Sequence, residues 1–217
     1  MFRFLLPPVD RSCYLPSAYG ERMPTRAVVW LKEERAGCEF AEIALKPDRL
    51  TARGVAIGIS PIPYRLDYVL ETAAGFVTTL LDVSSRGAGW SRGLVLRSNG
   101  TGSWTVDADA DGHPDLNPPG GDAAALAGAL DCDLGLSPVT NLMPILRHGL
   151  LSGGEPVELT AAWVSVPDLW VQPDGQRYTS VGENLVRYDA LDGSFSTTIT
   201  VDDDGLVVDY PGIACRI

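Results

Sequence analysis

The sequence has few of the residues on which metal and cofactor chemistry most often depends. It contains two histidines, and its four cysteines stand far apart with no C-x-x-C pair. This spacing gives no support to a structural zinc site. A phosphate-binding G-x-x-x-x-G-K-S/T motif is missing, as is a glycine fingerprint between a strand and a helix. We therefore expect no metal and no cofactor, and nothing indicates nucleotide binding.

Basic clusters and long apolar runs are also missing. The formal charge is −11, with no cluster of Lys and Arg, which argues against nucleic acid and an anionic membrane surface as partners. No run approaches the roughly 20 apolar residues of a membrane helix. The N-terminal apolar run, which Arg3 interrupts, is too short for a signal peptide and ends at two prolines. We expect a cytoplasmic protein with free thiols and no transmembrane segment.

Turn-forming residues are abundant, with 23 glycines and 16 prolines, while hydrophobic residues make up 45%. This composition predicts a real core built from many short strands. Apolar and polar residues alternate over 64–70, as in a strand with one buried face. Asn99-Gly100 and Asp204-Gly205 predict hairpin turns. Residues 107–125 read as a long loop, with short helices over 123–130 and 141–150. The fold class is all-β, with one or two short helices.

The chain is predicted to have an extended N-terminal arm, residues 1–26, followed by one domain over residues 27–217. A faint internal repeat relates about 27–110 to 156–217, because residues 68–96 and 188–208 share a similar order of tyrosine, phenylalanine and glycine. Common strand composition explains this order as well as a duplication does. Two similar curved sheets would enclose either a core or a cavity.

Gly89-Trp90-Ser91-Arg92-Gly93 matches the G-x-S-x-G elbow that exposes a nucleophilic serine in hydrolases. That motif requires a strand-to-helix turn, whereas a strand-like Leu94-Val95-Leu96 follows here. The base would have to be His113 or His148, and no acid is spaced to orient either of them. We interpret the segment as a hairpin loop.

Asp107-Ala108-Asp109-Ala110-Asp111-Gly112 resembles the start of a calcium loop. Such a loop needs a glutamate at its twelfth position, where this chain has Pro118. A solvated acidic turn is the simpler interpretation, and no metal ligands are assigned.

The most distinctive segment runs from Asp131 to Arg147, with the sequence DCDLGLSPVTNLMPILR. Asp131 and Asp133 share one strand face, and the Ser, Thr and Asn side chains that follow can satisfy backbone groups. The segment is either a structural plug that pairs its own polar groups or a patch that holds a head group, with Arg147 as a donor fork. The residues alone favour the plug.

This segment resembles the signature D-x-D-L-x-x-T-P-x-T-N-x-x-P-I-x-R of a bacterial family described as "Putative glycolipid-binding". Ser137 stands where the family often has Thr, and Leu146 where it often has a basic residue. Further similarity lies at Val29-Trp30, at residues 37–39 and 64–68, and in the closing residues 204–212. The resemblance covers about 27–217. It implies a spiral β-roll or open antiparallel barrel built from two similar halves, with no catalytic residues.

The predicted function is binding of a lipid-like or glycolipid-like small amphipathic molecule in an apolar cavity between curved sheets. Burying an acyl chain there would contribute about 0.8 kcal/mol per methylene. The candidate ligand-binding residues are Trp30, Glu39, Tyr64, Tyr68, Asp131, Asp133, Thr140, Asn141, Arg147, Gln176 and Tyr178. Nine aromatic residues suit a cavity mouth, and we expect two or three of them to line it: Trp30, Trp90, Trp104, Trp163, Trp170, Tyr64, Tyr68, Tyr178 and Tyr188.

Two alternatives remain open. An enzyme would use Glu39, Asp131 or Asp133 as a base and would show a carboxylate with a raised pKa in a cleft. A ligand-free interaction module would show a solid interior and an exposed apolar patch or strand edge. Exposed edges also make a homodimer plausible.

Overall fold

The computed structural model describes residues 25–34 and 36–217, which form one sheet of fourteen strands with short helices. The strands are β1 (Thr25–Lys32), β2 (Gly37–Leu45), β3 (Leu50–Gly58), β4 (Tyr64–Thr72), β5 (Thr78–Gly87), β6 (Trp90–Ser98), β7 (Trp104–Asp111), β8 (Asp131–Leu134), β9 (Val157–Val164), β10 (Val171–Gly182), β11 (Leu185–Ala190), β12 (Ser196–Val201), β13 (Val207–Tyr210) and β14 (Ala214–Arg216). One α-helix, α1 (Leu142–Arg147), is accompanied by the 3₁₀ turns η1 (Ala74–Phe76), η2 (Ala123–Leu126), η3 (Pro138–Asn141) and η4 (Leu150–Ser152).

The sheet order places the two halves of the chain side by side. Strands β1 to β7 follow one another in a meander, and β8 to β14 form a second run of neighbours. The halves meet where β1 pairs with β14, through registers such as Trp30↔Arg216. Every pairing is antiparallel except that of β8 with β9. The predicted open, all-β architecture is therefore confirmed, since the sheet does not close into a barrel.

Alternating burial explains the strands. In β3 and β4 nearly every second side chain is buried, and the residues between them are more exposed. A strand alternates its side chains between two faces, so this pattern gives the sheet an inner and an outer face. Cross-strand registers align Arg92, Ser85, Leu66, Ala56 and Glu39 in one inner row.

Large rings on the inner face cover glycines on adjacent strands. A Cβ atom added to Gly54 would lie about 2.5 Å from the ring of Tyr68, and Gly58 lies equally close beneath Tyr64. A glycine within a strand allows this close approach, because no side chain competes for the space. The bulky rings of β4 can therefore lie flat against β3 and leave the inner face compact.

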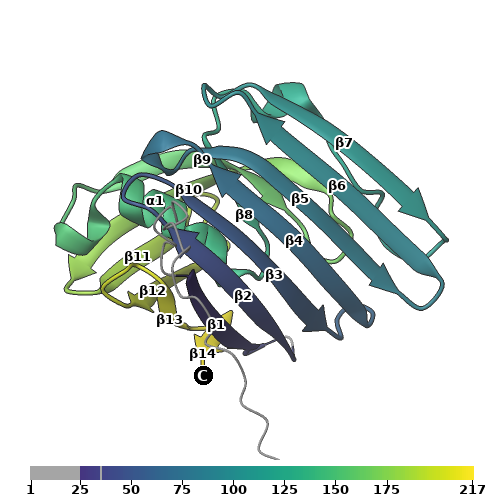
Figure 1. The fold of residues 1–217 in the computed structure, drawn as a ribbon, viewed down its shortest axis with the longest axis horizontal. Helices are drawn as coiled ribbons and strands as arrows, with labels where there is room; N and C mark the ends of the chain where they lie inside the picture. Colours follow the sequence, from purple (N-terminus) through teal and green to yellow (C-terminus); the bar gives the residue numbers. More distant parts are fainter. Residues whose placement is uncertain (1–24, 35) are drawn as a thin grey trace, which may run out of the picture.

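A twisted sheet of this width must curl, and its inside must then be filled. Figure 1 shows α1 enclosed between strands of the two halves. Leu142 and Met143 of α1 are buried in one core cluster with Leu70 and Leu81 of the first half and Val164 of the second. Residues 131–152 therefore fill much of the space that the curved sheet encloses.

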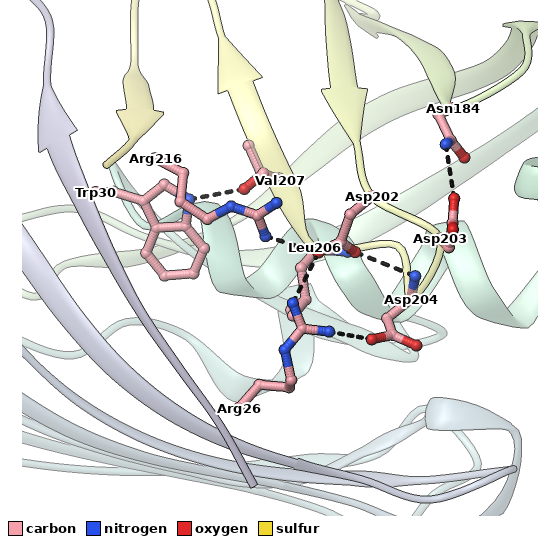
Figure 2. A network of polar contacts seen from close by, with 9 residues as sticks. All are labelled: Arg26, Trp30, Asn184, Asp202, Asp203, Asp204, Leu206, Val207 and Arg216. Carbon is pink, nitrogen blue, oxygen red and sulfur yellow. Dashed lines mark hydrogen bonds and ion pairs between the residues drawn. The ribbon is translucent and has the colours of Figure 1, made fainter. Parts of the chain in front are cut away.

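Polar contacts reinforce the junction between the halves (Figure 2). Arg26 of β1 donates to Asp202, at 3.2 Å, and to Asp204, both in the turn before β13. Arg216 of β14 donates to Asp202 at 2.7 Å. The indole Nε1 of Trp30 donates to the carbonyl oxygen of Val207 at 2.9 Å. These contacts connect β1 to β13 and to the turn before it, and that turn to β14.

The two outermost strands are protected differently. The exposed side chains of β7 include Asp107, Asp109 and Asp111, and charge discourages pairing with another chain. Alongside β8, Thr78 of β5 accepts a hydrogen bond from the amide of Cys132, at 3.0 Å, through its side chain. The strand β7 runs to Asp111, into the predicted loop 107–125, because Asp111 pairs with Ser91 of β6.

Other boundaries also differ from the sequence predictions. Residues 123–130 form only the short turn η2, and the helix predicted over 141–150 is limited to α1. The segment from Val171 to Gly182 is one continuous strand, although it contains Pro173 and Gly175. The division into an arm and a domain stays a prediction: residues 1–24 lie outside the described residues, and Thr25 and Arg26 begin β1.

The Gly54–Tyr68 contact gives a stability prediction. We expect Gly54→Ala to lower the free energy of unfolding by about 1–3 kcal/mol, since the new methyl group must displace a buried ring. Urea unfolding followed by circular dichroism measures the change. Gly182→Ala is the matched control, because its Cβ would lie 3.3 Å from the flexible end of Leu185. Equal effects of the two substitutions would contradict the proposed packing.

Candidate functional site

The largest pocket among the described residues lies mainly in the second half and has a volume of about 730 Å³. Strands β8 to β11 and β13 line it, together with the loops that follow β7, β8, β9 and β11. Its lining residues are Pro61, Asp115, Leu116, Asn117, Asp133, Leu134, Gly135, Leu136, Ser137, Asn141, Trp163, Ser165, Val166, Pro167, Asp168, Gln172, Asp174, Tyr188, Ala190, Asp192, Ser194, Phe195, Tyr210 and Ile213.

Asp133 of β8 is the most constrained acid of this pocket. The hydroxyl of Thr140 donates to its Oδ1 at 2.8 Å, and Nε2 of Gln176 donates to its Oδ2 at 2.7 Å. No lysine, arginine or histidine among the described residues forms an ion pair with it. Two neutral donors therefore fix the carboxyl group without neutralising it.

Burial raises the pKa of Asp133 from 3.8 to about 6, because a low-dielectric environment disfavours the charged form. The hydrogen bonds from Thr140 and Gln176 lower the pKa, and the charges of Asp174 and Asp131 raise it. The effect of desolvation on the pKa of Asp133 is larger than that of the two hydrogen bonds. Asp133 therefore changes its charge close to neutral pH.

Strand β10 presents polar side chains to the interior at alternate positions. Gln176 shares its amide nitrogen between Asp133 and Asp174, the latter at 3.0 Å. Tyr178 donates to Asn141 at 3.0 Å and contacts Oε1 of Gln176 at 3.2 Å. Burial and the charge of Asp133 raise the pKa of Tyr178, so its phenol remains a donor. This chain of contacts orients the acceptors that face the pocket.

Aromatic rings form one side of the pocket. Tyr188 lies 6.1 Å from Phe195 and 6.2 Å from Tyr210, and Phe195 lies 6.2 Å from Tyr210, measured between ring centroids. Trp163 of β9 also lines the pocket. These spacings are typical of packed aromatic pairs, so the rings hold one another in place.

The loop between β9 and β10 supplies another fixed acid. Asp168 accepts hydrogen bonds from the hydroxyl of Ser165 and, at 2.9 Å, from Nδ2 of Asn117. The Ser165 hydroxyl also accepts from the amide of Trp170 at 3.0 Å. This network ties the loop that follows β7 to the rim of the pocket.

Glu39 lies in a separate, closed network in the first half. Its carboxylate accepts from Lys32 at 2.6 Å, from the phenol of Tyr68 at 2.8 Å and from Ser137 at 2.6 Å. Lys32 also donates to the carbonyl oxygen of Leu136. Burial, and then the charge of Glu39, raise the pKa of Tyr68, which therefore stays protonated. The network fastens the segment after β8 to the inner face of the first half.

Asp131 and Arg147 form a second buried pair. The arginine donates through both terminal nitrogens, with Nη1 lying 2.7 Å from the carboxylate, and the two side chains are 4% and 13% exposed. Nε of Arg147 lies 3.3 Å from Nε2 of His148. The guanidinium group of Arg147, which the sequence analysis considered as a donor to a ligand head group, therefore binds Asp131 instead.

The structure separates the eleven predicted residues into groups. Asp133 and Asn141 line the large pocket. Thr140 and Gln176 donate hydrogen bonds to Asp133, and Tyr178 donates one to Asn141. Four others contribute to the network around Glu39 or to the core: Trp30, Glu39, Tyr64 and Tyr68. The remaining two, Asp131 and Arg147, form an ion pair that lines a second pocket of about 530 Å³. Of the nine candidate aromatic residues, Trp163 and Tyr188 line the large pocket.

The lining is more polar than the apolar cavity with a few convergent polar groups that the sequence predicted. It combines carboxylates and amides with rings and with aliphatic residues such as Leu116, Val166 and Ile213. The prediction missed Asp174 of β10. It also missed Asp168 and the other loop residues, because loops from distant parts of the chain meet only in the folded state. One signal was available: Gln172, Asp174, Gln176 and Tyr178 alternate along one strand, as inward residues do.

The other motifs do not form a catalytic or metal site. Ser91 lies within the hairpin strand β6, paired with Arg86 and Asp111, and not on an exposed strand-to-helix turn. Among residues 25–34 and 36–217, no three His, Cys, Asp or Glu side chains gather as metal ligands would. The same part of the chain contains no helix long and apolar enough to cross a membrane.

The buried Lys32–Glu39 pair predicts strong coupling. Lys32→Met should lower the free energy of unfolding by about 3–5 kcal/mol, because it leaves a buried carboxylate without its cation. Adding Glu39→Gln should recover at least about 1 kcal/mol relative to the sum of the single effects. Chemical unfolding of the four proteins in this double-mutant cycle measures the coupling.

The exposed pair Arg177–Glu158 provides the matched cycle, with Arg177→Met and Glu158→Gln. Its coupling should stay below about 0.5 kcal/mol, since solvent screens it. Additive effects at Lys32 and Glu39 would show that their contact does not hold the two segments together.

The raised pKa of Asp133 predicts a pH-dependent stability. A group whose pKa is higher in the folded state stabilises the protein below its unfolded pKa and loses this contribution as pH rises through the folded pKa. Compared with Asp133→Asn, the wild type should therefore lose stability between about pH 4 and pH 6, by up to roughly 3 kcal/mol. Unfolding at a series of pH values measures the difference. Asp107→Asn controls for the loss of one charge, and a flat difference for Asp133→Asn would contradict the shift.

Comparisons with known proteins agree with this architecture. A crystal structure of a DUF1089 family protein from Pseudomonas aeruginosa is similar, with a TM-score of 0.63 and 31% sequence identity over 82% of this chain and 92% of that chain. No protein with a curated description matches the chain. The profile of the family described as "Putative glycolipid-binding" matches residues 27–216, which is nearly the whole described structure. The chain therefore belongs to this family.

Proposed function

We propose that this protein reversibly binds a glycolipid-like amphipathic molecule and that the large pocket of the second half receives its head group. The main support is the pocket itself, whose volume of about 730 Å³ lies in the range of small-molecule sites. It also combines ring faces with several convergent hydrogen-bond acceptors. This combination suits a sugar, whose hydroxyl groups donate to carboxylates.

Acceptors are already fixed on several sides of the pocket. Asn117 and Ser165 hold Asp168, and Gln176 holds both Asp133 and Asp174. Hydrogen bonds to charged acceptors are stronger than those between neutral groups, and fixed side chains lose little freedom on binding. Preorganisation of this kind supports binding of a polar head group.

The apolar residues of the pocket suit the first part of a hydrocarbon tail. Leu116, Leu136, Val166 and Ile213 share the lining with the polar groups. Each methylene buried against them would contribute about 0.8 kcal/mol before the costs of association. A long acyl chain exceeds this space, because residues 131–152 fill much of the sheet interior. In this proposal the head group, rather than the whole tail, determines recognition.

Catalysis is a second candidate, since Asp133 is a carboxylate with a raised pKa in a pocket, as a general acid would be. Asp174 lies nearby, and both acids contact the same nitrogen of Gln176, at 2.7 and 3.0 Å. Glycosidases likewise use a pair of carboxyl groups. However, Thr140 and Gln176 occupy both oxygens of Asp133, which suits a fixed acceptor better than a proton donor. We therefore favour binding without catalysis.

Titration with n-octyl β-D-glucoside below its micelle concentration tests the proposed binding. We expect saturable binding by calorimetry, with a change in tryptophan fluorescence. Trp163→Ala should weaken binding by about tenfold, because it removes a ring that lines the pocket. Trp170→Ala is the matched control, since this residue is exposed and outside the lining. Release of octanol would instead indicate hydrolysis.

Mass spectrometry of organic extracts from natively purified protein provides an independent measurement. A stoichiometric amphipathic molecule should be recovered, or else be taken up by delipidated protein. Failure of both experiments, together with no saturable binding of the glucoside, would overturn the proposed function.

A further inference from the structure

The acids of the large pocket lack the counter-charges that the buried carboxylates Glu39 and Asp131 have. Its lining includes Asp115, Asp133, Asp168, Asp174 and Asp192 and no lysine, arginine or histidine. None of these five carboxylates forms a salt bridge with a described residue. The pocket is thus a partly open region in which negative charges are not balanced by positive ones.

Nearby basic residues are already committed to other acids. Arg147 is held by Asp131, and Lys32 by Glu39. Both pairs are buried, and separating either would leave a charge without a partner. Neither of these two cations is therefore free to turn toward the pocket and neutralise it.

Two of these acids, Asp133 and Asp174, have pKa values raised mainly by burial and further by neighbouring carboxylates. Burial raises the pKa of Asp174, to which the charge of Asp192 contributes. Burial likewise raises the pKa of Asp133, and the charges of Asp174 and Asp131 raise it further. A positive group bound between these carboxylates would offset the unfavourable interaction between their charges.

The rings and the size of the pocket indicate which kind of cation would fit. The cluster of Tyr188, Phe195 and Tyr210 offers aromatic surface beside the acids, and ring faces attract ammonium groups. The carboxylates do not gather as metal ligands do among the described residues. The pocket, at about 730 Å³, is also far larger than a metal ion requires. A bulky organic cation would fill more of this volume than a metal ion and could contact the aromatic rings.

We propose that the bound head group carries a positively charged amine, as in an amino sugar or a quaternary ammonium group, and that the pocket selects against anionic head groups. This inference rests on the proposed function for the location of the site. It extends that function by assigning the charge of the ligand. The shared chemistry is an ammonium group attached to an apolar chain.

Four probes with the same octyl chain test the inference by calorimetry: octyl β-D-glucosaminide, octyl β-D-glucoside, octyl β-D-glucuronide and octyltrimethylammonium. At low salt the glucosaminide should bind about tenfold more tightly than the glucoside, and the glucuronide more weakly than both. Sodium chloride should weaken the glucosaminide more than the glucoside, because salt screens the charge.

Asp174→Asn should reduce the preference for the amine, whereas Asp107→Asn, which removes an exposed charge from β7, should preserve it. The series of probes on the wild-type protein remains decisive if the variant does not fold. Equal binding of glucoside and glucosaminide would overturn the charge inference and leave the proposed function standing. Binding of octyltrimethylammonium alone would support a positively charged head group and would overturn the proposal that the head group is a sugar. Binding of none of the four would overturn both.

Discussion

The placement of residues 131–147 inside the sheet depends on three interior carboxylates, Glu39, Asp131 and Asp133, each of which needs partners. A buried charge is costly unless it is paired, so each needs partners within the fold. Glu39 has a lysine and two hydroxyl groups, and Asp131 has a bidentate arginine. These pairs fasten residues 131–147 inside the curved sheet. Asp133 has only neutral donors, and it is the one that faces the pocket.

The two halves use similar meanders for different purposes. In the first half Tyr68 covers Gly54 and donates to Glu39, so its ring and hydroxyl are both committed to the core. In the second half Tyr188 packs against Phe195 and Tyr210, and the three rings border an open pocket. The internal repeat predicted from the sequence aligns these two tyrosines, although a common origin of the halves stays a prediction. One half is thus closed by its aromatic residues, while the other exposes part of them.

The sequence predicted local features better than the site. Alternation over 64–70 and the turns at Asn99-Gly100 and Asp204-Gly205 correspond to strand β4 and to two hairpins, because such signals depend on neighbouring residues. The segment 131–147 was distinctive in sequence, yet its residues divide between pocket and structural pairs according to partners more than 15 positions away, such as Gln176 for Asp133. Asp168 and Asp192 lie in loops, where no periodic pattern indicates which side chains converge.

The family description names a glycolipid, and a tail-binding cavity was the natural expectation from it. The filled interior and the polar lining of the pocket point instead to recognition through the head group. Methylene groups bind any apolar surface with similar energy, so a tail confers affinity but little selectivity. Selectivity arises where charges are fixed and unbalanced, because the wrong head group then meets repulsion as well as lost hydrogen bonds. The uncompensated acids around Asp133 meet this condition, whereas the paired acids of the core do not.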